Sequence, residues 1–179
     1  MPIELESGGV RMRTATPADA DLLCKWWNDP GVMEHAGFPN GLGTNLARVV
    51  QTISRNDNSR QLMILESEHL PVGEIHFQLE DESSARIGIK ICNPDYQGRG
   101  IGSTSLTMLI AYLFDERDCQ RIVLDTNMKN TRAQHVYEKL GFRVVALRPD
   151  SWKNQLGELQ GSVDYELQRK AYDGTEPTV

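Results

Sequence analysis

The sequence has 179 residues, of which 39% are hydrophobic and 25% are charged, and its formal net charge at pH 7 is −6. These values are typical of one globular domain, and they exclude a disordered chain, a collagen-like chain and a disulfide scaffold. The negative charge argues against nucleic acid as a partner, because it repels phosphate backbones.

The first part of the chain predicts one strand, two helices and a loop. Alternation over Val10–Arg13 predicts the strand, and Thr16–Pro17 is typical of a helix start. Apolar spacing predicts that this first helix ends at the breaker cluster that opens Asn28–Gly43, and that a second helix covers Thr44–Ile53. We expect Asn28–Gly43 to be a loop that orders around a ligand.

The middle of the chain changes to short β-rich runs. Gln61–Glu66, Val72–Leu79 and Ala85–Cys92 are predicted strands, and Leu70-Pro71 and Asp81–Ser84 are predicted turns between them. These segments predict an antiparallel meander.

Helices and strands alternate in the last part of the chain. In order, the predicted elements are helix Ile101–Phe114, strand Arg121–Thr126, helix Thr131–Leu140, strand Phe142–Leu147 and strand Val163–Gln168. Arg148–Gly161 is expected to be a polar loop, and Ala171–Val179 a frayed tail. The whole order predicts a mixed α+β sheet in a single domain, residues 1–179.

The sequence also predicts the compartment. No apolar run approaches the ~18 residues of a membrane helix, and the first residues do not resemble a signal peptide. The three cysteines, Cys24, Cys92 and Cys119, are widely spaced, which predicts reduced thiols and no metal site. We therefore expect a cytoplasmic protein with neither a membrane nor a metal ion among its partners.

The segment Pro94–Gly102 carries the most information about chemistry. It follows a predicted strand, opens a predicted helix and contains Gly98, Gly100 and Gly102. Such a turn presents backbone N–H groups at a positive helix end, which suits a phosphate, although it is also compatible with a merely tight turn. The pattern lacks the lysine of a P-loop, and a serine stands where a dinucleotide fingerprint needs its third glycine.

Two motifs resemble the GNAT superfamily of N-acetyltransferases. Gln97–Gly102 has the form Gln/Arg-x-x-Gly-x-Gly/Ala, and Asn130–Phe142 has the form Asn-x-x-Ala-x-x-x-Tyr-Glu-x-x-Gly-Phe. The resemblance covers about residues 10–169. It implies the GNAT fold, a mostly antiparallel sheet flanked by helices and splayed between two parallel strands, Ala85–Cys92 and Arg121–Thr126.

The resemblance also implies a donor substrate, acetyl-CoA, held in the gap between those strands. Its pyrophosphate is expected on the N–H groups of residues 98–103, its pantetheine on the backbone of residues 90–92 and on Asn130. The implied cofactor-binding residues are Lys90, Ile91, Cys92, Gln97, Gly98, Arg99, Gly100, Ile101, Gly102, Ser103 and Asn130.

Three residues are candidates for proton transfer. Tyr137 would face the acetyl sulfur as general acid, although its apolar neighbours also suit a core tyrosine. For the base, some members of the family carry a carboxylate on the strand that here has Arg86, Ile87 and Gly88, so this sequence departs from that pattern. Asp125 and then Glu74, with His76 on the same face, are the alternatives; each also suits an edge charge, and the reaction also runs in principle without a dedicated base.

The resemblance implies direct transfer to a primary amine in a ternary complex. The stretch Trp26–Val32 is similar to the branch with ribosomal-protein alanine, spermidine and aminoglycoside acetyltransferases, so the acceptor is expected to be a protein N-terminus, a polyamine or an aminoglycoside-like molecule. A homodimer is compatible with this family. The alternative is a regulatory module that binds CoA without turnover.

Overall fold

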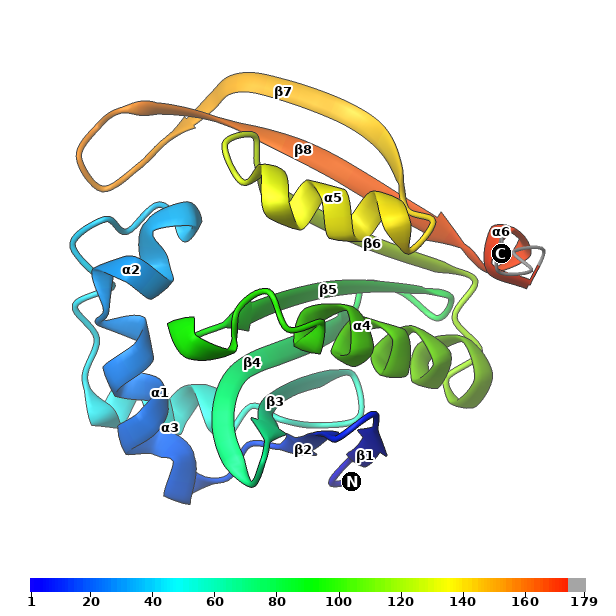
Figure 1. Cartoon of the computed structure of the whole chain (residues 1–179), viewed down its shortest axis with the longest axis horizontal. Helices are drawn as coiled ribbons and strands as arrows, with labels where there is room; N and C mark the ends of the chain where they lie inside the picture. The colour runs from blue at the N-terminus through cyan, green and yellow to red at the C-terminus, as the bar shows by residue number, and fades with distance from the viewer. Residues whose placement is uncertain (174–179) are drawn as a thin grey trace.

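The computed structural model describes residues 1–173, in which all strands belong to a single eight-stranded sheet of order β1-β2-β3-β4-β5-β6-β8-β7. Figure 1 shows the sheet running from β1 at the bottom of the view to β7 at the top. The strands are β1 (Glu4–Ser7), β2 (Val10–Thr14), β3 (Arg60–Ser67), β4 (Leu70–Leu79), β5 (Ser84–Ile91), β6 (Arg121–Asn127), β7 (Arg143–Lys153) and β8 (Leu159–Gln168).

Helices lie on both faces of the sheet. They are α1 (Ala20–Trp27), α2 (Pro30–Met33), α3 (Leu46–Ile53), α4 (Ile101–Ala111), α5 (Thr131–Lys139) and α6 (Arg169–Asp173), with 3-10 turns at Pro17–Asp19, Glu34–Ala36 and Pro94–Tyr96. The helices α4 and α5 pack on one face, and α1 and α3 pack on the other. No helix within residues 1–173 is long and apolar enough to cross a membrane.

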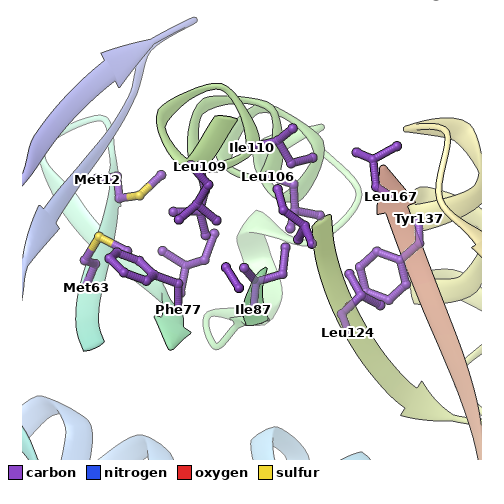
Figure 2. Close-up of a cluster of buried hydrophobic side chains, with 14 of the residues drawn as sticks. Met12, Met63, Phe77, Ile87, Leu106, Leu109, Ile110, Leu124, Tyr137 and Leu167 are labelled. Atoms are coloured by element: carbon purple, nitrogen blue, oxygen red, sulfur yellow. The ribbon is translucent and has the colours of Figure 1, made fainter. Parts of the chain in front are cut away.

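The larger core lies under α4 and α5. Leu109 of α4 packs over Met63 and Phe77 of the sheet, and Tyr137 of α5 lies beside Leu124 of β6 (Figure 2). The strand β3 buries both of its faces, because Met63 points to this core while Ile64 joins a second cluster under α1 and α3. Its near-continuous apolar run therefore reflects a central strand.

The sheet splits between β5 and β6. All neighbouring strands are antiparallel except this pair, which is parallel and joined only over Ser84–Arg86 and Arg121–Val123. Beyond these residues β5 stays paired with β4, and β6 stays paired with β8, so their inner edges diverge. The predicted fold class, a mixed α+β sheet splayed between two parallel strands, is confirmed.

Several predicted boundaries are wrong. Arg148–Gly161 is not a polar loop, because β7 extends to Lys153 and β8 begins at Leu159, which makes a long hairpin. Most side chains of β7 are exposed, so this strand lacks the apolar alternation that marks a half-buried strand. The strand Glu4–Ser7 was not predicted, for the same reason.

Two smaller corrections concern turns and loops. The first turn of the meander lies at Glu68–His69, where both residues have positive φ, so Leu70-Pro71 already belongs to β4. Asn28–Gly43 contains α2 and a 3-10 turn. The tail expected at Ala171–Val179 begins within α6, and residues 174–179 lie outside the described residues.

Gly73 lets β4 approach β5 closely, which predicts a cost for any side chain there. A Cβ at Gly73 would lie 2.3 Å from the carbonyl oxygen of Lys90. We expect Gly73→Ala to lower the free energy of unfolding by about 1–3 kcal/mol, as overpacking does, in urea unfolding without ligand. Gly102→Ala is the control, since a Cβ there meets nothing within 4 Å, and an unchanged midpoint in Gly73→Ala would contradict the close approach.

Candidate active site

The inner edge of β5 has no partner strand beyond Arg86. The N–H of Cys92 donates to the carbonyl of Val72 at 2.9 Å, and the carbonyl of Lys90 lies against Gly73, so both face β4. Alternation along the strand turns Ile91 toward the gap, where its carbonyl accepts a bond from the Gln97 side chain at 3.0 Å. Of the three residues predicted to pair with pantetheine, Ile91 is thus the one whose backbone faces the gap.

The glycine-rich turn forms an anion cradle at the mouth of this gap. Gly98 and Gly100 have φ of 75° and 78°, and Gly100 caps α4 without a side-chain bond. The N–H groups of residues 98–103 donate to no group of residues 1–173. A Cβ on Gly100 or Gly102 would meet nothing within 4 Å, so the space beside these two residues is open. A pyrophosphate fits both the donors and the space.

Two arginines flank the cradle. Arg99 lies over the ring of Tyr96, 4.7 Å from its centroid, and the Tyr96 hydroxyl donates to Glu68 at 2.9 Å. Arg132, from the first turn of α5, donates to the Gln97 side chain at 3.2 Å and lies 3.0 Å from where a Cβ of Gly98 would be. Arg132 was not among the predicted residues, because sequence spacing does not reveal that it reaches across to the turn.

Tyr137 has a buried ring and an accessible hydroxyl. Its ring packs edge-on against Phe142 and Tyr165, and the residue is 6% exposed. Within residues 1–173, every side-chain nitrogen or oxygen that is fully enclosed has a hydrogen-bond partner. The Tyr137 hydroxyl bonds no group of these residues. The hydroxyl oxygen is therefore not fully enclosed by the protein. Burial raises the pKa of Tyr137 to about 12, so the hydroxyl is protonated at pH 7.

Asn130 and Cys92 serve the surrounding structure. The Asn130 side chain accepts a bond from the N–H of Ala133 at 3.2 Å and so caps α5. Its contact with pantetheine stays a prediction. Burial raises the pKa of the thiols of Cys92 and Cys119, so both are protonated at pH 7 and neither is a thiolate nucleophile.

The opposite face of the sheet carries a buried ion pair. Glu74 is 3% exposed, and its two oxygens accept bonds from Lys90 at 3.0 Å and from the indole N–H of Trp27 at 2.8 Å. The two carboxylates are thus engaged differently, because Asp125 is half-exposed and accepts a bond from Arg86 at 3.1 Å.

The segment Asn28–Gly43 covers the gap on this face. Its turn Glu34–Ala36 contacts β6, and its backbone is bonded to the β7–β8 hairpin through Gln155, whose N–H donates to the carbonyl of Gly37 at 2.8 Å. The side chain of Gln155 makes two further bonds, to Asn40 and Gly41. The segment is therefore ordered by contacts within the chain rather than only by a ligand.

Fold and site together combine two parted parallel strands with a glycine-rich turn at the start of a helix. A family model described as an acetyltransferase (GNAT) domain matches residues 10–143. The chain belongs to this GNAT acetyltransferase family, as its motifs indicated.

Individual relatives agree with this assignment. The uncharacterized N-acetyltransferase p20 of Bacillus licheniformis is 25% identical over 172 residues, which cover 92% of this chain and 96% of that protein. Spermidine N-acetyltransferase from Vibrio cholerae, solved with CoA and spermine, matches with a TM-score of 0.82 at 19% identity, covering 93% of this chain and 99% of that one. The ribosomal L7/L12 alpha-N-protein acetyltransferase RimL matches with a TM-score of 0.79 at 17% identity, covering 94% and 95%.

The cradle predicts the effect of a side chain at Gly100. Gly100→Val should weaken acetyl-CoA binding at least about tenfold, or about 1.4 kcal/mol, because its branched side chain fills the space before the free N–H groups. Calorimetric titration measures this change.

Gly157→Val is the matched control for backbone strain. Gly157 has φ of 79° and open space around it, but it lies in the β7–β8 turn. Its variant should bind acetyl-CoA as the unsubstituted protein does. Equal affinity of a folded Gly100→Val variant would contradict the assigned pyrophosphate position.

Proposed function

We propose that the protein transfers the acetyl group of acetyl-CoA to a primary amine by direct transfer in a ternary complex. The observation that carries this proposal is the N–H cradle of residues 98–103, which bonds no group of residues 1–173 and lies at one end of the gap between β5 and β6. The Tyr137 hydroxyl, which also bonds no group of residues 1–173, supports it. The cradle suits the pyrophosphate, the edge of β5 without a partner strand suits the amides of pantetheine, and Tyr137 is proposed to face the thioester. Asn130, Arg99 and Arg132 complete the proposed donor site.

Direct transfer fits the thiols of the site. An acetyl-cysteine intermediate needs a thiolate, and the only cysteine at the end of β5, Cys92, is held as a thiol by burial. Holding both substrates together in one gap supplies a large part of the rate acceleration, because it removes the entropic cost of their encounter. The amine nitrogen then attacks the acetyl carbonyl directly.

Tyr137 is proposed to assist departure of the CoA sulfur. A thiol has a pKa of about 8.5, well below the value of about 12 for Tyr137. The hydroxyl therefore keeps its proton as charge develops on the sulfur, and its hydrogen bond stabilises the departing thiolate. A core tyrosine without this role would have its hydroxyl bonded to the protein, as that of Tyr165 is bonded to Glu138 at 2.9 Å.

The acceptor is proposed to be a primary amine on a protein N-terminus, a polyamine or an aminoglycoside-like molecule. Asp125 and, after it, Glu74 stay the predicted carboxylate bases, each already bonded to a cation. The accessible Tyr137 hydroxyl favours an enzyme over the alternative, a CoA-binding regulatory module. We further propose a cytoplasmic protein, one domain over residues 1–179, with a homodimer as the compatible oligomer.

An acetyl-CoA turnover screen tests this function. Free-thiol release is followed with an N-terminal alanine peptide, spermidine and an aminoglycoside, each against a reaction without amine. Amine-dependent release above that background supports the proposal, and mass spectrometry then locates the acetyl group. Tight acetyl-CoA binding without release for any amine class would favour the regulatory module.

Replacing the hydroxyl of Tyr137 separates its chemical role from its packing role. Tyr137→Phe should lower turnover about 10²-fold, within the range of general acid catalysis, with acetyl-CoA affinity and melting temperature little changed because the hydroxyl bonds no described residue. Steady-state kinetics and calorimetry measure both effects.

Tyr165→Phe is the matched control, because it removes a neighbouring hydroxyl that is bonded to Glu138. It should cost about 1 kcal/mol of stability and leave turnover nearly unchanged. Normal turnover by Tyr137→Phe would make Tyr137 a structural residue.

A further inference from the structure

His76 lies at the point where β5 and β6 part. It pairs across the ladder with Gly88, and Gly88 follows Arg86, the last residue of β5 paired with β6, by two positions. A Cβ on Gly88 would lie 2.4 Å from the Cε1 atom of His76 and 2.8 Å from its Nε2 atom. The imidazole therefore rests directly on the backbone of Gly88, and only glycine leaves room for it there.

Neither ring nitrogen of His76 is hydrogen-bonded to the described residues, and both are accessible. Neither nitrogen bonds any group of residues 1–173, and within that range no fully enclosed side-chain nitrogen or oxygen lacks a partner. The ring nitrogens of this half-buried residue are consequently not fully enclosed by the protein. They lie on the face of the sheet that carries Glu74 and Asp125, opposite the face from which Tyr137 approaches.

The neighbouring charges keep this imidazole neutral. Burial and then the positive charge of Lys90 lower the pKa of His76, while Glu74 and Asp125 act in the opposite direction and do not outweigh them. The other charged neighbour, Arg86 on β5, is bonded to Asp125 and Glu80. At pH 7 the imidazole thus has a free lone pair, whereas both oxygens of Glu74 already accept bonds.

We infer that His76, rather than Asp125 or Glu74, accepts the proton of the acceptor amine, an inference that rests on the proposed function. The amine nitrogen forms the C–N bond to the acetyl carbon, and its proton passes to a nitrogen of His76. The C–S bond breaks, and its electron pair stays on the sulfur, which receives the hydrogen bond of Tyr137. The imidazolium returns its proton to solvent. Gly88 is the positioning residue for this step.

The pH dependence of kcat/KM provides the first test. With an N-terminal alanine peptide, whose amine has a pKa of about 7.7–8.0, the slope of log kcat/KM against pH should rise from about 1 to about 2 where His76 is also protonated, below about pH 6.5. His76→Gln should lose about 10²-fold in kcat/KM and keep a slope of about 1 throughout. Acetyl-CoA affinity should stay unchanged.

Two variants control for other causes. His135→Gln removes an exposed histidine of α5 and should change neither rate nor slope. Gly88→Ala, which forces the imidazole away while keeping it in the chain, should reproduce the loss seen in His76→Gln. The inference would be overturned if Asp125→Asn or Glu74→Gln lost the slope of about 2 at low pH while His76→Gln kept it. The carboxylate concerned would then be the base.

Nuclear magnetic resonance of 13C-labelled imidazoles tests the placement without turnover. The signal missing from His76→Gln identifies His76, which should titrate below the ordinary value of about 6.5 and shift on addition of acetyl-CoA. An unshifted signal would place His76 away from the thioester and overturn the inference. Absence of turnover by the unsubstituted protein contradicts the proposed function, whereas normal turnover by His76→Gln contradicts only the role of His76.

Discussion

The parting of β5 and β6 is the constraint on which the site depends. Backbone N–H and carbonyl groups need partners, and an open inner edge leaves a row of them unpaired. The outer neighbours β4 and β8 hold the two strands in place, so the gap does not close by further pairing. Gln97 covers one of the exposed groups, the carbonyl of Ile91, and an extended ligand with amides of its own is suited to pair with others.

The two faces of the sheet present different functional groups around this gap. The face under α4 and α5 offers the N–H cradle and the hydroxyl of Tyr137, while the opposite face offers His76 and its charged neighbours. That second face is closed by parts far apart in the sequence, because Gln155 of the β7–β8 hairpin bonds the backbone that follows α2. On the proposed function, donor and acceptor approach the gap from different sides, which suits a direct transfer.

Local patterns made one half of this site predictable. The glycine-rich turn lies between a strand and a helix, and Tyr137 lies on a helix with a fixed spacing from its cap Asn130, so both positions followed from sequence alone. The hairpin was missed because β7 is exposed on most positions and shows no alternation. Short-range periodicity carries no signal for a strand that buries neither face.

The other half depends on contacts between distant segments. Whether Glu74 is bonded to Trp27, whether Arg132 reaches Gln97 and whether His76 rests on Gly88 are matters of strand register and helix placement. A shift of one residue in the register of β4 and β5 would turn His76 to the other face. The sequence therefore placed Glu74 and His76 on one face. It did not reveal that both oxygens of Glu74 accept bonds while the ring nitrogens of His76 stay unbonded.

Burial acts on the two proton carriers in opposite directions and for the same reason. It raises the pKa of Tyr137 and lowers the pKa of His76, because burial removes hydration and so disfavours the charged form of each group. The nearby charges of Lys90 and Arg86 are paired with carboxylates. On the proposed function, a neutral amine that enters this gap meets a neutral imidazole, so its proton passes to His76 as its nitrogen bonds to the acetyl carbon.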